Sequence, residues 1–190
     1  MGANGGGTPR AGFVLAGGKS SRMGCDKALL PFATSTLVDH IAGCVLQAAG
    51  SVTLIGPPER YRALEIPVVA DLVPGCGPLG GVFTALSITN ATWNLIVACD
   101  MPGLEVEFLQ TLFRAAENSG ADCVVPEDSA GLHPLCAVYH VRCREAAAAA
   151  IEAKSLKMHD FISSLRDEKI RATLPSVLEN INTPEQWSAR

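Results

Sequence analysis

The chain has 190 residues, of which 48% are hydrophobic and 18% are charged, and its formal net charge is −4. This length suffices for one domain with a complete core, and the composition excludes an intrinsically disordered chain. The negative charge gives no general attraction for nucleic acid, so we expect no nucleic-acid partner. No apolar run reaches the roughly 18 residues that cross a bilayer, so we expect no membrane partner.

The first ten residues are rich in glycine and lack the apolar segment of a secretory signal peptide. We expect residues 1–10 to form a flexible arm and residues 11–190 to form a single domain. Short apolar runs predict strands at 12–16, 51–55, 67–70, 94–99, 121–125, 134–140 and 170–174. Helical spacing of apolar residues or strong helix formers predict helices at 36–49, 59–64, 80–88, 105–119, 142–154, 155–165 and 184–189.

This alternation of strands and helices predicts an α/β fold, in which a mostly parallel, twisted sheet carries helices on both faces. Ligands of such sheets bind outside the carboxyl ends of the strands. Gly17 follows the first predicted strand, Asp71 the third and Asp100 the fourth. Because the carboxyl ends of parallel strands share one edge, we expect these three loops to converge on one crevice.

The cysteines are seven in number and include no C-x-x-C pair. Several of them, such as Cys99, lie in apolar runs, which is typical of buried free thiols in a reducing cytoplasm. The four histidines have no zinc-binding spacing either. We therefore predict a cytoplasmic protein without a zinc site.

The segment from Phe13 to Lys27 is the most informative part of the chain. A buried-strand pattern ends there in a loop with three glycines and the cations Lys19, Arg22 and Lys27. Glycines let backbone N–H groups approach an anion closely, and the cations neutralise it. The P-loop motif G-x-x-x-x-G-K-[ST] does not fit, because Phe13 stands where its first glycine belongs. The pattern predicts a loop that holds a nucleoside triphosphate.

Residues 15–27 follow the pattern L-A-G-G-x-S-x-R-M-G-x-D-K and resemble the signature of the nucleotidyltransferases that activate sugars and cofactors. The paired glycines and the Asp26-Lys27 step look most like the molybdenum cofactor guanylyltransferases. The resemblance extends from Gly12 to Glu185 in four ordered motifs and implies a Rossmann-like nucleotidyltransferase fold. It also implies nucleotide contacts and stabilisation of the transferring phosphate by the first loop, through Leu15, Ala16, Gly17, Gly18, Arg22 and Lys27.

The segment from Gly75 to Gly80 matches the dinucleotide-binding pattern G-x-G-x-x-G literally. That interpretation is weak, because the motif comes late in the chain and Pro78 interrupts it. The resemblance implies instead that this loop lies beside the nucleobase, with Gly77 and Gly80 in contact with the nucleotide. A plain turn before a helix is the alternative.

Asp100 follows a fully apolar strand, where a carboxylate requires a compensating cation. Mg²⁺ fits, because it typically takes only one or two protein carboxylates together with phosphates and water. Residues 99–102 resemble the family's C-D-x-P metal motif, and a helix N-cap is the alternative. For Asp71 the resemblance implies a nucleotide contact, either with guanine or by support of the base loop. Capping of a turn is its alternative.

The segment from Asn180 to Glu185 resembles the family's N-x-N-T-P-E element. In an extended segment Asn180 and Asn182 would face one side and Ile181 the core, and paired amides suit a polar substrate. Thr183 and the proline after it also fit a helix start, which does not explain the asparagines.

The resemblance implies that the terminal phosphate of molybdopterin, with or without molybdenum, attacks the α-phosphorus of GTP with the help of Mg²⁺. Pyrophosphate leaves, and a guanine dinucleotide form of the cofactor results. Transient contacts with molybdenum-insertion or molybdoenzyme-maturation proteins are implied as well. Four alternatives remain: a cytidylyltransferase on the same cofactor, a sugar-phosphate nucleotidyltransferase, a non-catalytic GTP-binding regulator, and a dehydrogenase that uses the later glycine motif. The roles of His133 and Lys157 stay open.

Overall fold

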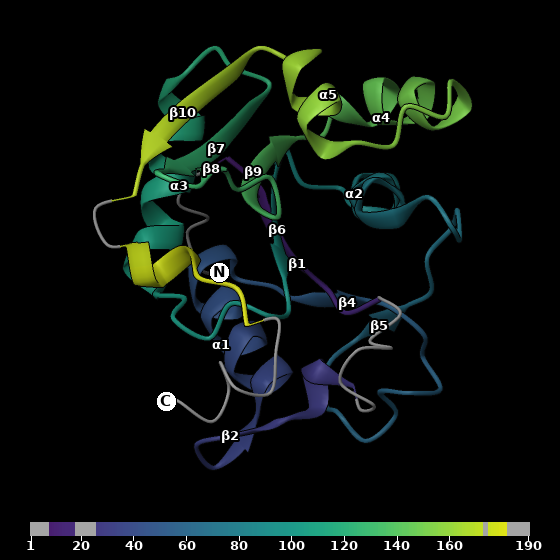
Figure 1. Cartoon of the computed structure of the whole chain (residues 1–190), viewed down its shortest axis with the longest axis vertical. Coiled ribbons are helices and arrows are strands. Elements are labelled where there is room, and N and C mark those ends of the chain that lie inside the picture. Colours follow the sequence, from purple (N-terminus) through teal and green to yellow (C-terminus); the bar gives the residue numbers. More distant parts are fainter. Residues whose placement is uncertain (1–7, 18–25, 173–174, 182–190) are drawn as a thin grey trace, which may run out of the picture.

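The computed structural model describes residues 8–17, 26–172 and 175–181. The strands of its central sheet are β1 (Arg10–Leu15), β4 (Thr53–Ile55), β5 (Val68–Val69), β6 (Trp93–Ala98), β7 (Cys123–Asp128), β8 (Gly131–Leu132), β9 (Cys136–His140) and β10 (Asp167–Arg171). Their order across the sheet is β10-β7-β9-β6-β1-β4-β5, and β8 pairs with β7 (Figure 1). A separate hairpin joins β2 (Pro31–Phe32) to β3 (Ser35–Thr36).

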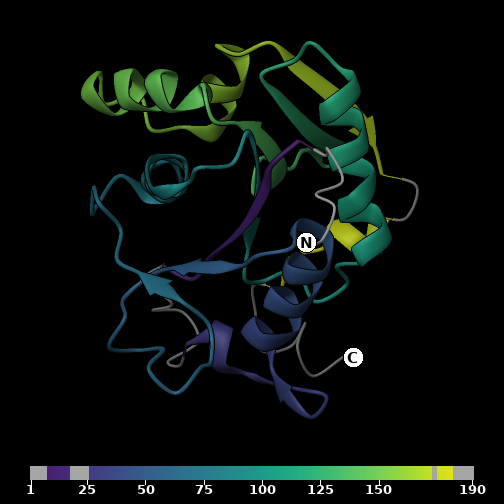
Figure 2. The same cartoon turned by 180° about the vertical axis from the view of Figure 1, so that it is seen from behind.

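Helices cover both faces of this sheet (Figures 1 and 2). The α-helices are α1 (Leu37–Ala49), α2 (Gly77–Ile88), α3 (Val106–Asn118), α4 (Cys143–Glu152) and α5 (Met158–Ser163), and two 3₁₀ turns are η1 (Lys27–Leu29) and η2 (Pro175–Leu178). Helices α1 and α3 pack on one face, whereas α2, α4 and α5 pack on the other. The structure thus confirms the predicted α/β fold.

Strand direction is parallel throughout the sheet except at β9 and the short β8. The chain reverses from β7 through β8 into β9 within a few residues, which is too short for the crossover that a parallel pair requires. Strand β9 therefore runs antiparallel to both β6 and β7, its neighbours in the sheet.

The two halves of the core are separated by the alternation of side chains along the strands. In β1, Phe13 packs toward α2 and α5, and the next residue, Val14, packs toward α1 and α3. Helix α3 contributes Leu109, Leu112 and Phe113, each with no exposed surface. Burial of each such side chain stabilises the fold by about 1.5–3 kcal/mol.

Local sequence sets the ends of the two helices nearest to the loops of interest. Thr36 caps α1 in a reciprocal pair with Asp39, and Gly50 ends the helix with a φ of 80°. Helix α2 begins at Gly77, three residues earlier than predicted, because the proline after it suits the first helical turn.

Three expectations about elements need correction. The helix predicted at 59–64 is wrong: i→i+3 turns replace it, and they direct Tyr61 into the core. Six residues form only a marginal helix, so the burial of one large ring decides the conformation. The last strand lies at β10 rather than at 170–174. Residue 10 was expected in the flexible arm, but strand β1 begins at Arg10, which pairs with Trp93 and so belongs to the sheet.

The helix predicted at 184–189 lies outside the described residues. Within those that are described, no helix is long and apolar enough to cross a membrane.

Candidate functional site

The three loops that the sequence singled out lie at one edge of the sheet. Gly17 follows β1, Asp71 follows β5 and Asp100 follows β6, and all of these strands are parallel. Strand β1 lies between β6 and β4, with β5 beyond β4. Three strand spacings, roughly 14 Å, therefore separate the β6 end from the β5 end. The loop after β1 begins between them, so the three loops start on the same side of the sheet, as the sequence predicted.

Lys27 and Asp100 meet the C-terminal segment at this edge. The Lys27 ammonium donates a hydrogen bond to the carbonyl of Ile181 at 3.1 Å. The N–H of Ile181 donates to the Asp100 carbonyl at 2.9 Å. Ile181 is buried and Asn180 is exposed, as the alternation predicted. Three motifs that are far apart in sequence are thus joined by hydrogen bonds.

The Asp100 carboxylate has the environment of a cation ligand. Its Oδ1 atom is buried and has no hydrogen-bond partner among the residues that the structure describes. Burial raises the pKa of this carboxyl, and the nearby Lys27 charge opposes that shift only in part. The alternative N-cap role is excluded for α3, because Glu105 occupies that position.

An unpartnered buried carboxylate oxygen fits Mg²⁺, which accepts oxygen ligands and tolerates few from the protein. No cluster of three or more His, Cys, Asp or Glu side chains occurs in the described part of the chain.

The Asp71 carboxylate holds the loop before α2. Its Oδ1 atom accepts hydrogen bonds from the N–H of Val73 at 3.0 Å and from the Thr84 hydroxyl at 2.9 Å. The same hydroxyl accepts from the N–H of Leu72 at 3.0 Å. These bonds show that Asp71 caps the turn, which was the alternative to a nucleotide contact; contact with guanine and support of a base-binding loop stay predictions.

Glycines let this loop approach α2 closely. A Cβ atom on Gly80 would come within 3.1 Å of both Asp71 Oδ2 and the Val73 carbonyl. Gly77 has a φ of 61°, in the left-handed region that other residues rarely adopt. The glycine spacing thus reflects a tight loop at the start of α2, with exposed backbone at its turn.

The end of β1 is fixed on both sides. The Leu15 carbonyl accepts from the N–H of Cys99 at 3.2 Å, and the Ala16 N–H donates to the Ile55 carbonyl at 2.9 Å. The predicted site residues Gly18, Arg22 and Asn182, together with Lys19 and Thr183, lie outside the described residues.

Tyr61 and His133 lie outside the four motifs. The Tyr61 side chain reaches the end of β1, where its hydroxyl lies 2.6 Å from the Ala16 carbonyl. A single tyrosine in a polar stretch gives no periodic signal, so sequence reasoning missed it. His133 pairs with Asp128 at 2.9 Å, and this contact lowers the pKa of the carboxyl.

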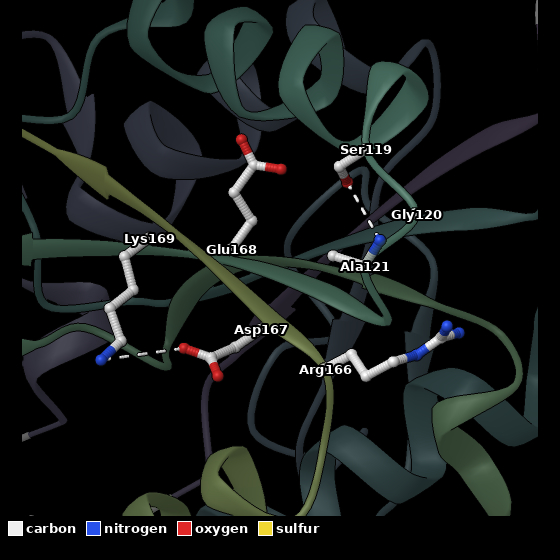
Figure 3. A pocket seen from close by; sticks show the side chains of 7 residues that line it. All are labelled: Ser119, Gly120, Ala121, Arg166, Asp167, Glu168 and Lys169. Atoms are coloured by element: carbon white, nitrogen blue, oxygen red, sulfur yellow. Dashed lines mark hydrogen bonds and ion pairs between the residues drawn. The ribbon is translucent and has the colours of Figure 1, made fainter.

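An open hollow elsewhere on the surface is not part of this site. Its lining residues are Ser119, Gly120, Ala121, Arg166, Asp167, Glu168 and Lys169 (Figure 3). They lie at the starts of β7 and β10, whereas Asp71 and Asp100 follow the ends of their strands. Because these strands are parallel, the hollow lies at the opposite edge of the sheet.

Comparison with known proteins agrees with this geometry. The sequence model of the MobA-like NTP transferase domain matches residues 12–169. A Flavobacterium johnsoniae protein named "Probable molybdenum cofactor guanylyltransferase" is 34% identical over 177 residues, which are 92% of each chain. A protein of the same name from Mycobacterium marinum is 35% identical over 179 residues, covering 91% of this chain and 89% of its own.

A solved structure shares the fold over nearly the whole length. Molybdopterin-guanine dinucleotide biosynthesis protein A from Archaeoglobus fulgidus superposes with a TM-score of 0.82 at 21% identity. The match covers 94% of this chain and 95% of that one. With the family match over residues 12–169 and the two relatives above 30% identity, the conclusion is direct: this chain belongs to the MobA-like NTP transferases, in the family of the molybdenum cofactor guanylyltransferases.

Proposed function

We propose that this protein transfers GMP from GTP to the terminal phosphate of molybdopterin, with or without bound molybdenum. The names of its relatives give the chemistry, and one observation at the site supports it. The Lys27 ammonium and the backbone carbonyl of Asp100 both bond to Ile181 in the C-terminal segment, and the buried Asp100 carboxyl lies close enough to Lys27 for that charge to oppose part of the rise in its pKa that burial causes. A cation, a metal-ligating carboxylate and a substrate-facing segment in one place are what nucleotidyl transfer requires.

In the proposed reaction, an oxygen of the molybdopterin phosphate attacks the α-phosphorus of GTP. A new P–O bond forms, the bond from that phosphorus to the bridging oxygen breaks, and pyrophosphate leaves with the electron pair. Lys27 and Arg22 stabilise charge on the triphosphate. Asp100 would hold Mg²⁺, which when bound neutralises charge on the phosphate oxygens. No side-chain nucleophile is required.

Binding of the substrates is divided among the loops at this edge. We assign the triphosphate to Leu15, Ala16, Gly17, Gly18 and Lys27, and the base to Asp71, Gly77 and Gly80. Asn180 and Asn182 would present their amides to the molybdopterin side. The hydrogen bonds of Asp71 hold the loop before α2, and in this assignment that loop would read guanine.

Residues 11–190, together with Arg10 of β1, would act as one nucleotidyltransferase domain, preceded by a short arm. The six cysteines in the described ranges are free thiols, which favours a reducing cytoplasm as its location. Proteins that insert molybdenum or mature molybdoenzymes would contact it transiently.

Labelled GTP tests this function. The protein is incubated with molybdopterin, Mg²⁺ and GTP labelled at either the α- or the γ-phosphorus. We expect the α-label in the pterin product and the γ-label in pyrophosphate. Transfer of the γ-label to the pterin, or no transfer at all, would overturn the proposal.

A further inference from the structure

Tyr61 occupies an unusual position for a residue outside every motif. It lies in the turns between β4 and β5 and is only 1% exposed. Its hydroxyl is 2.6 Å from the carbonyl oxygen of Ala16 and 2.9 Å from Oδ2 of Asp26. Ala16 follows β1 and Asp26 precedes η1, so one buried hydroxyl connects the two described segments that flank residues 18–25.

The hydroxyl is a permanent donor between two acceptors. It carries one proton, which Ala16 and Asp26 compete for at these distances. Burial, and then the neighbouring carboxylate, raise the pKa of Tyr61 well above its usual value, so the phenol stays protonated. A glycine makes the approach of the ring possible: a Cβ atom on Gly56 would lie 3.1 Å from both the ring and the Ala16 carbonyl.

The Asp26 carboxylate connects Tyr61 to the turn that carries Lys27. Its Oδ1 accepts from the N–H of Ala28 at 3.1 Å and thereby caps the 3₁₀ turn that begins at Lys27. Its Oδ2 faces Tyr61 and also Arg60, whose guanidinium lies 3.3 Å away. The Arg60 side chain is 45% exposed, so that ion pair contributes little. The buried phenol is the stronger anchor.

We propose that Tyr61 and Asp26 form a clasp that fixes Lys27 relative to the end of β1, which makes Tyr61 a positioning residue for nucleotidyl transfer. The inference rests on the proposed function, since it assigns Lys27 to the triphosphate. Tyr61 itself does not touch the substrate in this account. It acts by holding the strand end and the lysine-bearing turn in one register.

The test is a double-mutant comparison of Tyr61→Phe, Lys27→Ala and the double variant. The phenylalanine keeps the ring and removes only the hydroxyl. We expect Tyr61→Phe to lower kcat for GMP transfer about tenfold, with a smaller change in KM for GTP. In the Lys27→Ala background the same substitution should change kcat less than twofold, because the group that it positions is already gone.

A matched control is Tyr139→Phe. Tyr139 is also fully buried, and its hydroxyl donates to a backbone carbonyl, that of Pro134, at 2.7 Å. Both variants lose one buried hydroxyl, so their thermal midpoints should fall by similar amounts, but Tyr139→Phe should keep its kcat. Equal losses of kcat in the two variants would show a general packing effect and overturn the clasp.

A tenfold effect of Tyr61→Phe that persists in the Lys27→Ala background would overturn it too, because the two residues would then act independently. Wild type, the two single variants at Tyr61 and Lys27 and the double variant are also compared for binding of GTP and Mg²⁺ by calorimetry. Inactivity of the wild-type enzyme would count against the proposed function alone, since the coupling of Tyr61 to Lys27 would still be measured in binding. Additive effects on binding would then contradict the clasp.

Discussion

Lys27 and Asp100 carry the chemistry of the proposed site. Both residues bond to Ile181, Lys27 through its ammonium and Asp100 through its backbone carbonyl. The two side chains differ in their hydrogen-bond partners. The lysine has a backbone acceptor, whereas one buried oxygen of the aspartate has no partner in the described part of the chain, so the aspartate has the stronger requirement for a ligand.

Substitution of Lys27 by alanine tests the role of the ammonium. Loss of one preorganised charge-assisted contact to the transition state costs about 2–4 kcal/mol, so kcat should fall by roughly 10²–10³. The melting temperature should change little, because the side chain lies at the edge of the sheet. A kcat within threefold of wild type would remove Lys27 from the reaction.

Asp100→Asn tests the carboxylate through stability. Because burial raises its pKa in the folded protein, the protonated form is favoured by folding, and that stabilisation is lost as pH rises through the raised pKa. When both proteins are free of metal at pH 7, the asparagine variant should therefore melt at a higher temperature than wild type, because it lacks the buried ionised carboxylate. The difference should vanish below about pH 4, near the usual carboxyl pKa.

Calorimetric melts from pH 3.5 to 8, with a chelator present, measure this difference. An asparagine variant that melts below wild type at pH 7 would mean that the carboxylate is already stabilised by the protein. With Mg²⁺ and GTP present, only wild type should gain stability from the metal.

Sequence reasoning located Lys27 from the glycine-rich loop with its cations and from the resemblance of that loop to the nucleotidyltransferases. It identified Asp100 from a charge placed after an apolar run, and the structure confirms the burial that this implies. It could not find Tyr61, because a contact between residues 45 positions apart depends on the turn geometry and leaves no periodic pattern.

At the scale of elements, the site depends on how the C-terminal segment is seated. The turn η2 packs beside Gly103, where an added Cβ would clash with the Ser176 carbonyl. Val177 and Leu178 in this turn are buried in the core. The glycine therefore lets η2 lie close enough to bring Ile181 to Asp100.

Gly103→Ala should displace η2 and disturb the site from a distance. Overpacking of this kind costs about 1–3 kcal/mol, and kcat should fall because Ile181 shifts away from Lys27. The control is Gly43→Ala in α1, where an added Cβ meets nothing within 4 Å. That variant should gain about 0.5–1 kcal/mol of stability and keep its activity. Unchanged kinetics in Gly103→Ala would show that the seating of η2 is unimportant.

The sequence predicted most elements but not every direction or boundary. A strand is predicted at 134–140, where the structure has β9, but the sequence pattern does not encode the antiparallel pairing of β9, which the short return from β7 imposes. The last strand was misplaced because Ile170 to Leu174 alternates in polarity more clearly than β10 does. Strand β10 is an edge strand in which Lys169 and Arg171 are exposed.

At the scale of the whole molecule, the two ends of the parallel strands have different roles. The proposed site lies where the strands end, and a charge cluster around Asp122 lies where they begin. This carboxylate binds the guanidinium groups of Arg142 and Arg166, and it also accepts from the Arg166 N–H at 3.0 Å. The cluster ties the start of β7 to the segments before α4 and β10.

Asp122→Asn separates stability from activity. The arginine contacts, above all that of Arg166, lower the pKa of the carboxyl. The ionised group therefore stabilises the fold above about pH 4, and this contribution is lost as pH falls further. The variant should melt on the order of 2–4 °C lower at pH 7 and converge with wild type in acid. Its KM for GTP should not change; a weaker GTP affinity would contradict the roles assigned to the two ends of the strands.

The account as a whole is tested most directly by initial rates of pyrophosphate release from GTP, CTP and UTP. Each nucleotide is supplied with Mg²⁺, in the presence and absence of molybdopterin. We predict release from GTP that requires molybdopterin and exceeds release from CTP and UTP at least tenfold. Faster release from CTP would make the protein a cytidylyltransferase. Tight GTP binding without any release of pyrophosphate would contradict the claim that this edge of the sheet catalyses nucleotidyl transfer.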